Sequence, residues 1–233
     1  MNKPGTPEDL PSPRELLVRA AAMAAVEAAV PHEAYSAFFT VNDDGVGHQD
    51  GGGNDWALEP LEGGRAVLYG CDHEMSWTRF HEPPLDLLAG APGWLPLERL
   101  ADMQAAKELG FVYWYDGTWH RVEYPDDLRD DGLASTVGGT ADVVQLLDHV
   151  ANDVIGARWG GEEVEEDDGL MAALEETVRA AREGALEETL RRAREGALSA
   201  ESFAWLSNGW EPDLSAALDT ARRAGLTPNP LQP

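Results

Sequence analysis

Apolar residues near the start of the chain recur at a spacing that predicts a helix. The Ala-rich run from Pro13 to about Val30 is long enough for one, and Pro31 ends it. Ser12 marks the start, because a proline follows it and Glu15 stands three residues further on. In this capping-box arrangement the two side chains bond the free backbone N–H groups of the first turn.

Three later segments have the pattern of strands. Residues 35–42, "YSAFFTVN", are rich in aromatic and β-branched side chains. Residues 65–71, "RAVLYGC", form an apolar run without alternation, which is typical of a buried strand. Residues 111–124, "FVYWYDGTWHRVEY", predict a hairpin in which Asp116 and Gly117 make a two-residue turn. Both faces of that hairpin carry large apolar side chains, so we expect at least one face to pack on a helix.

The glycine-rich stretch between the first two strands predicts a loop. Residues 43–55, "DDGVGHQDGGGND", hold too many glycines for a regular element. Its acids resemble a calcium loop, but the EF-hand template begun at Asn42 places Gly53 at the twelfth position, where a bidentate acid is required. The sequence therefore predicts no calcium site here.

Helices at residues 96–110 and from Thr140 onward complete the first part of the chain. These elements predict an α+β fold with a small, mainly antiparallel sheet flanked by helices, followed by a short all-helical C-terminal region. Six acids in the seven positions from Glu162 to Asp168 predict an exposed linker, because like charges repel. The expected organisation is a loose N-terminus (1–11), an α+β domain (12–156), an acidic linker (157–169), a helical tail (170–227) and a loose C-terminus (228–233).

The tail contains a duplicated twelve-residue segment. "ALEETVRAAREG" (residues 173–184) is followed at once by "ALEETLRRAREG" (residues 185–196). Twelve residues rotate a helix by about 120° beyond whole turns, so one straight helix would wind the apolar stripe away from itself. Gly184 and Gly196 offer breaks, and we therefore expect short helices in place of one long rod.

The charge balance limits the classes of partner. The chain has 43 acidic and 17 basic residues and a formal net charge of -26, which repels nucleic-acid phosphates and anionic lipids. A basic protein partner would suit it. The single Cys71 cannot form an internal disulfide, the first residues lack the pattern of a signal peptide, and residues 16–30 are too short and too charged to span a bilayer. We expect a cytoplasmic protein with no direct contact to nucleic acid or membrane.

The stretch "GCDHEMSWTRFHEP", residues 70–83, concentrates the side chains that could carry chemistry. Asp72, His73, Glu74 and His81 are possible metal ligands, but the two histidines are eight residues apart, a spacing that metal motifs do not use. No nucleophile elbow and no phosphate-binding glycine loop is present. The sequence thus predicts no metal and no cofactor, and it identifies no catalytic residue. A metal-dependent hydrolase centred on these four residues is the alternative function.

We interpret the loop instead as a contact surface that carries a tryptophan, since tryptophan is favoured at interface centres. The acidic run offers a second surface, and in a third hypothesis it mimics nucleic acid by replacing phosphates. The predicted partner-binding residues are Asp72, His73, Glu74, Trp77, His81, Glu162, Glu163, Glu165, Glu166, Asp167 and Asp168.

The order of these elements resembles a family. A helix, then "YSAFFTVNDDG", "NDWALEPL" and "GRAVLYGCDHE", a proline-broken loop, an aromatic hairpin and a helix look like the small acidic α+β immunity proteins of bacterial toxin systems, of the broad SUKH kind. The resemblance covers residues 12–156, and the helical tail departs from it. It implies a non-enzymatic protein that binds and blocks a toxin, often a nuclease.

Overall fold

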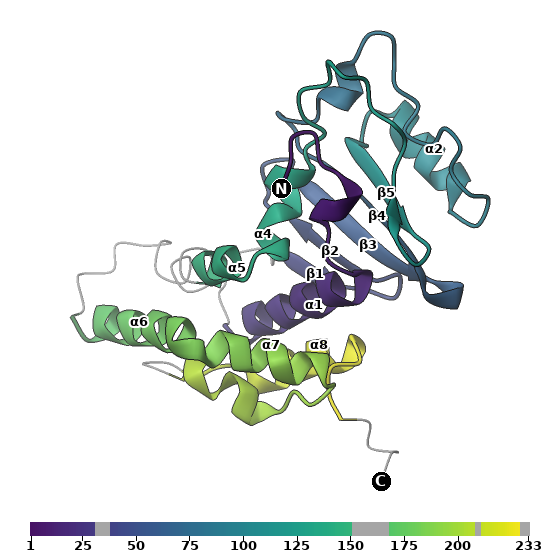
Figure 1. The fold of residues 1–233 in the computed structure, drawn as a ribbon. Helices are drawn as coiled ribbons and strands as arrows, with labels where there is room; N and C mark the ends of the chain where they lie inside the picture. The colour runs from purple at the N-terminus through teal and green to yellow at the C-terminus, as the bar shows by residue number, and fades with distance from the viewer. Residues whose placement is uncertain (31–37, 151–167, 208–210, 229–233) are drawn as a thin grey trace. The chain divides into compact units, whose positions relative to one another are not determined.

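The computed structural model describes residues 1–30, 38–150, 168–207 and 211–228 and shows an α+β fold (Figure 1). The antiparallel sheet has the strand order β1-β2-β3-β4-β5-β6, so each strand lies beside its neighbour in the sequence. The strands are β1 (Phe39–Val41), β2 (Val46–Gln49), β3 (Asp55–Leu61), β4 (Arg65–Cys71), β5 (Phe111–Tyr115) and β6 (Trp119–His120).

The helices come before, between and after the strands. The α-helices are α1 (Pro13–Ala29), α2 (Leu97–Ala105), α3 (Leu133–Thr136), α4 (Gly138–Ala141), α5 (Val143–His149), α6 (Asp168–Ala180), α7 (Leu186–Arg194) and α8 (Leu214–Arg223). Short 3₁₀ turns lie at Pro7–Asp9, Glu62–Gly64, Trp77–Phe80 and Ala200–Leu206, and a π-type turn lies at Ala181–Ala185. Within the described ranges, no helix is long and apolar enough to cross a membrane.

The chain forms two units, which we call the sheet unit (residues 1–16 and 43–141) and the helical unit (residues 17–42 and 142–233). This division differs from the expected one, because most of α1 and the segment from residue 142 group with the tail. Two contacts show why. The backbone N–H of Asp213 donates to the carbonyl oxygen of Ala29 at 2.8 Å, and His149 Nε2 lies 2.9 Å from the Glu27 carboxylate.

One core cluster of the sheet unit lies between α2 and one face of β4 and β5, and Leu68, Phe111 and Tyr113 on the other face of these strands are buried as well. Val67 and Tyr69 on β4 and Val112 and Trp114 on β5 are buried together with Leu100 of α2. Strand β4 was predicted correctly at residues 65–71, and the expectation that a helix covers one face of the hairpin is confirmed. Burial of this apolar surface is the main stabilising contribution to the unit.

The hairpin turn differs from the prediction. Tyr115 pairs with Trp119, so three residues connect the strands, and the backbone N–H of Asp116 donates to the carbonyl oxygen of Thr118 at 3.0 Å. Only Gly117 has a positive φ, 83°. A two-residue type I′ turn needs two such residues, whereas a three-residue loop needs one. The prediction of a two-residue turn was therefore wrong.

Two other predicted elements need correction. The glycine-rich loop contains β2, whose residues pair with β3 from Val46 opposite Leu58 to Gln49 opposite Asp55, because pairing with a long neighbour offsets weak strand propensity. The helix expected from Thr140 instead begins at Val143, since the Asp142 side chain accepts the N–H of Val144 and caps it.

The N-terminal residues are held by the sheet unit, although the sequence led us to expect a loose segment. The N–H of Gly5 donates to the buried carboxylate of Asp131 at 2.9 Å, and Arg121 Nε donates to the Gly5 carbonyl oxygen at 3.0 Å. The indole of Trp119 donates to the carbonyl oxygen of Pro11 at 2.7 Å. These partners are distant in sequence, so local composition could not reveal them.

The break inside the duplicated segment is confirmed. Gly184 has φ 112° and lies in the π-type turn between α6 and α7. Gly196 follows α7 with φ 65°. Thr177 in the first copy and Thr189 in the second occupy equivalent positions, and both are buried. Each copy therefore buries its own face, which is what the turn at Gly184 permits.

Candidate partner-binding site

The loop after β4 begins with a buried aspartate. Cys71 ends the strand, and burial raises the pKa of its thiol. Asp72 is 4% exposed, and its Oδ1 accepts the backbone N–H groups of Glu74 and Met75 at 2.8 Å each. These bonds form a local turn of the kind that short acids favour. Asp72 thus shapes the loop and has little surface to offer a partner.

Ser76 fixes the loop to the rest of the sheet unit. Its hydroxyl accepts the N–H of Asp72 at 2.9 Å and donates to the carbonyl oxygen of Asp131 at 2.8 Å. A Cβ atom at Gly110 or at Gly132 would collide with the Ser76 side chain. The two glycines therefore leave the room that Ser76 occupies, and the backbone of the loop has one defined path.

The segment that receives the loop is itself held by buried hydrogen bonds. Asp131 is fully buried and accepts the Tyr113 hydroxyl at 2.9 Å in addition to the N–H of Gly5. Burial, followed by the nearby Asp131 carboxylate, raises the pKa of Tyr113. The N–H of Trp77 donates to the carbonyl oxygen of Asp130 at 3.1 Å. Because the acceptors are buried and satisfied, the loop rests on a rigid support.

The outer side of this loop exposes two aromatic rings. Trp77 is 43% exposed and Phe80 is 58% exposed. The guanidinium of Arg129 lies 4.9 Å from the Trp77 ring centroid, and Arg79 and Lys107 each lie 5.1 Å from that of Phe80. We call these five residues the aromatic–cation cluster. Distances of this size are those of cation–π contacts.

A cavity of about 340 Å³ opens beside the cluster. Phe80 and Lys107 line it together with the buried side chains of Leu87 and Leu109. His81 also lines it, and its ring nitrogens lie 2.9 Å from the Pro83 carbonyl oxygen and 3.2 Å from an Asp127 carboxylate oxygen. These two acceptors raise the pKa of His81. The lining of the cavity thus combines apolar and charged side chains, as ligand sites commonly do.

The four possible metal ligands do not meet at one point. His73 and Glu74 are exposed, the N–H of His73 donates to Asn54, and His81 is engaged by Asp127. Among the described residues, no group of three His, Cys, Asp or Glu side chains could hold a metal ion. The hydrolase alternative thus has no metal site in this part of the chain.

The acidic run falls almost entirely outside the described residues. Glu162, Glu163, Glu165, Glu166 and Asp167 lie there, and Asp168 is the first residue of α6. The second predicted surface and the nucleic-acid mimic therefore stay predictions.

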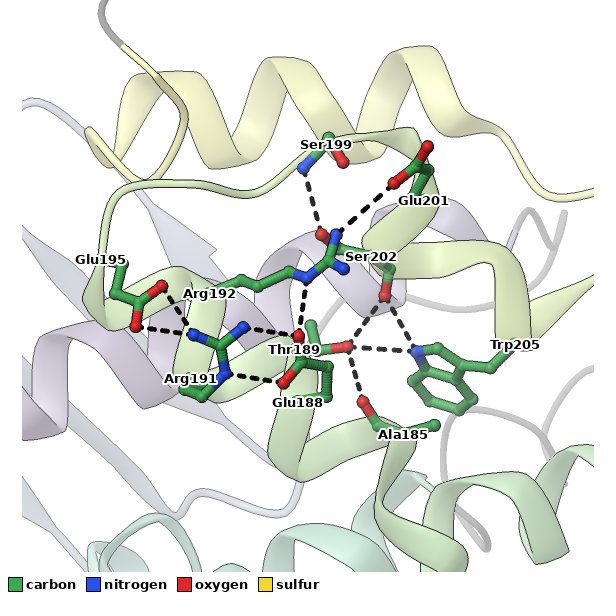
Figure 2. A network of polar contacts seen from close by, with 10 residues as sticks. All are labelled: Ala185, Glu188, Thr189, Arg191, Arg192, Glu195, Ser199, Glu201, Ser202 and Trp205. Carbon is green, nitrogen blue, oxygen red and sulfur yellow. Dashed lines mark hydrogen bonds and ion pairs between the residues drawn. The ribbon is translucent and has the colours of Figure 1, made fainter.

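In the helical unit, arginines form ion pairs with glutamates, in contrast to the aromatic–cation cluster (Figure 2). Arg191 donates to both Glu188 oxygens at 2.7 Å and to both Glu195 oxygens at 2.7 and 2.8 Å. Arg192 donates to Glu188 at 2.8 Å and approaches Glu201 at 3.8 Å. Hydrogen bonds from the two arginines lower the pKa of Glu188 to about 2. Every charge in this network faces an opposite charge.

A buried polar contact lies beneath this network. The Trp205 indole donates to the Thr189 hydroxyl at 3.2 Å and to the Ser202 carbonyl oxygen at 3.1 Å. The same hydroxyl lies 2.9 Å from the Ala185 carbonyl oxygen and 2.8 Å from that of Ser202, so it can donate to either (Figure 2). These contacts tie α7 to the 3₁₀ turn that follows it.

Sequence reasoning found Trp77 but missed four members of the cluster. Arg79 and Phe80 are close to it in "WTRF", where aromatic and cationic side chains mix, and that mixture could have been noticed. Lys107 is one of two lysines in the chain and has φ 60°, and Arg129 comes from a third segment. Nothing in the local pattern connects those two residues with the loop.

Comparison with known proteins adds no assignment. No family model, no curated protein and no solved structure matches this chain. The resemblance to SUKH immunity proteins therefore stays a prediction.

Proposed function

We propose that this chain is a non-enzymatic binding protein and that the aromatic–cation cluster is the centre of its contact surface with a partner protein. The observation that carries the proposal is the exposure of Trp77 and Phe80 on a loop whose backbone is fixed by Ser76. Large exposed apolar side chains that gather at one place mark interaction sites. Tryptophan and arginine, both present here, supply much of the binding energy at interfaces.

The rigid support of the loop favours binding. A contact surface that is already ordered loses little conformational entropy when a partner arrives. The hydrogen bonds of Ser76 and Asp131 provide that order before binding. The cluster and the cavity beside it therefore form a preorganised surface.

The net charge of -26 suggests the class of partner. Such a charge attracts a basic protein over distances of about a Debye length, roughly 8 Å at physiological salt. Together with the resemblance, this supports an immunity-type inhibitor that neutralises a basic toxin such as a nuclease. The attraction predicts an association rate that falls as salt increases.

The test is capture from extract of the cells that make the protein, followed by measurement with the purified partner. We expect one protein to bind the full chain, and to lose about tenfold or more in affinity when Trp77→Ala and Phe80→Ala are combined. Val144→Ala is the matched control, because Val144 is 63% exposed on α5 of the helical unit. Equal affinity of the double variant and the control for the purified partner would refute the proposal.

A further inference from the structure

We propose that the aromatic–cation cluster recognises an acidic peptide segment of the partner, with a carboxylate bound by its cations and an adjacent apolar side chain in the cavity. This inference rests on the proposed function and specifies the chemistry of the same site. The inference is based on three cations that have no carboxylate partner in the described part of the chain, Arg79, Lys107 and Arg129. Within the residues that the structure describes, no carboxylate oxygen lies within 4.0 Å of their charged groups.

Most of the described basic residues elsewhere in the chain have acceptors, and the exposed Arg182 does not. Arg99 donates to Glu59 at 2.6 and 2.8 Å, and Arg191 is bonded to two glutamates. Where no carboxylate is near, Arg65 and Arg121 donate to backbone carbonyl oxygens at 2.7 and 3.0 Å. With 43 acids for 17 bases, a cation has many possible acidic partners. Three neighbouring cations without one are therefore a local exception that suits an external anion.

The guanidinium of Arg79 has few hydrogen-bond acceptors within the described residues. Its Nε is buried and has no hydrogen-bond partner among the described residues, and its Nη1 reaches only the His73 carbonyl oxygen at 3.4 Å. A guanidinium carries five N–H donors in a planar fork that matches a carboxylate. Burial raises the pKa of Asp55 overall, and the charge of Arg79 acts to lower it, but the two groups form no ion pair. The buried Nε is closed to an external ligand, so Arg79 contributes mainly a positive charge without a carboxylate partner among the described residues.

The cavity specifies what accompanies the carboxylate. The buried apolar side chains of Leu87 and Leu109 line it, and so do the exposed Phe80 ring and the cations Arg79 and Lys107. Glu82 is the acid among the lining residues. At about 340 Å³ the cavity has room for one aliphatic side chain, and the cations in its lining place the carboxylate next to it. A glutamate beside a leucine meets both requirements.

A peptide fits this site better than a nucleic acid does. A polyphosphate brings a negative charge with every residue, and the net charge of -26 repels it as a whole. A short acidic segment on a basic partner brings a few carboxylates, while the partner's overall charge still attracts this chain. The basic surface of the partner would attract this chain from a distance, and the acidic segment would bind the cluster at close range. The two interactions do not conflict, because they act over different distances.

Fluorescence anisotropy with defined probes tests the inference on the full chain. The probes are the labelled peptides GSEELEGS, GSQQLQGS and GSEEAEGS and a deoxythymidine oligonucleotide of the same length. We expect the first peptide to bind about tenfold more tightly than its glutamine analogue, because charge-assisted hydrogen bonds are about twice as strong as neutral ones. The alanine analogue should bind about threefold more weakly, since it leaves the apolar lining of the cavity uncovered.

Variants locate the site. Lys107→Gln combined with Arg129→Gln should weaken binding of GSEELEGS about tenfold. Arg179→Gln combined with Arg222→Gln is the control, because it makes the same charge change at exposed arginines of the helical unit, and it should alter binding less than about twofold. Equal binding of the glutamate and glutamine peptides, or equal losses in both double variants, would overturn the inference. Tighter binding of the oligonucleotide would assign the site to nucleic acid instead.

The two proposals fail separately. If GSEELEGS does not bind while the purified partner still requires Trp77 and Phe80, the chemistry inferred for the cluster is wrong and the proposed function stands. If the partner binds the Trp77→Ala and Phe80→Ala variant normally, the proposed function fails whatever the peptide does.

Discussion

Each unit of this protein contains a group of arginines, and the two groups differ in their partners, although Arg99 of the sheet unit is paired with Glu59. In the helical unit, Arg191 and Arg192 are bonded to glutamates three and four residues away along the chain (Figure 2). In the sheet unit, Arg79 and Arg129 lie over exposed aromatic rings and have no carboxylate within 4.0 Å among the described residues. The first arrangement satisfies its charges within the chain, and the second leaves them for something outside it.

The difference shows which charged groups can be read as functional. Pairs at helical spacing contribute little to stability and keep a surface soluble, so they need no partner to explain them. Cations that remain unpaired in a chain with net charge -26 have no such explanation. The arrangement of charge is therefore more informative than its total, which by itself indicated only a basic partner.

The largest expected effect concerns the support of the cluster. Gly132→Ala should lower the free energy of unfolding by about 2–4 kcal/mol, because overpacking costs about 1–3 kcal/mol and a side chain at positive φ adds about 1 kcal/mol. Gly132 has φ 89°, and its Cβ would lie 2.9 Å from that of Asp72 and against the Ser76 hydroxyl. Urea unfolding measures the change.

Gly93→Ala is the control for that substitution. No heavy atom lies within 4 Å of a Cβ placed there, and its φ is outside the left-handed region. The control should change stability by less than about 0.5 kcal/mol, as surface substitutions usually do. Equal stabilities of the two variants would show that the loop tolerates displacement and that the cluster is not preorganised.

The sequence predicted the local part of this support but not the rest. Strand β4 was found because its apolar run is continuous, and the turn that Asp72 forms directly after it uses a residue type that favours turns. The bond from Ser76 to the Asp131 carbonyl oxygen joins residues 55 positions apart, and no local pattern encodes it. Strand β2 was missed for the same reason, because this short segment of the glycine-rich stretch becomes a strand only through pairing with β3.

The candidate site was predictable to a similar extent. Trp77 was identified by residue type alone, whereas Lys107 and Arg129 reach the loop only through the fold. Asp72 was expected to contact a partner, yet it is buried and bonded to backbone N–H groups. Side-chain chemistry could thus be read from the sequence, and exposure could not.

The next effect tests the buried contact of the helical unit. Thr189→Val should cost about 1 kcal/mol, the typical value of one net hydrogen bond, because the Trp205 indole loses an acceptor and a carbonyl oxygen loses a donor. Thr189→Ser keeps the hydroxyl and removes only a methyl group, so it separates the bond from the packing. A valine variant as stable as the unmodified protein would mean that the hydroxyl contributes nothing.

A smaller effect is expected from the cation–π contact between Arg129 and Trp77. A double-mutant cycle of Arg129→Gln with Trp77→Leu should give a coupling of about 0.5 kcal/mol, the size of an exposed cation–π contact. Arg129→Gln alone should cost little more than that, since it breaks no ion pair among the described residues. A coupling of zero in the unfolding experiment would show that Trp77 does not position the guanidinium.

The prediction with the smallest effect on stability concerns the pKa of Glu188. Its pKa of about 2 means that its bonds to Arg191 and Arg192 stabilise the fold above its usual pKa of 4.5 and lose that contribution as pH falls toward 2. Arg191→Gln should raise the pKa of Glu188 toward its usual value, as followed by NMR of the side-chain carboxyl carbon. Arg222→Gln, which removes a pair with Asp219 on α8, should leave it unchanged. If Glu188 titrates near 4.5 in the unmodified protein, the network does not persist in solution and the contrast between the two units disappears.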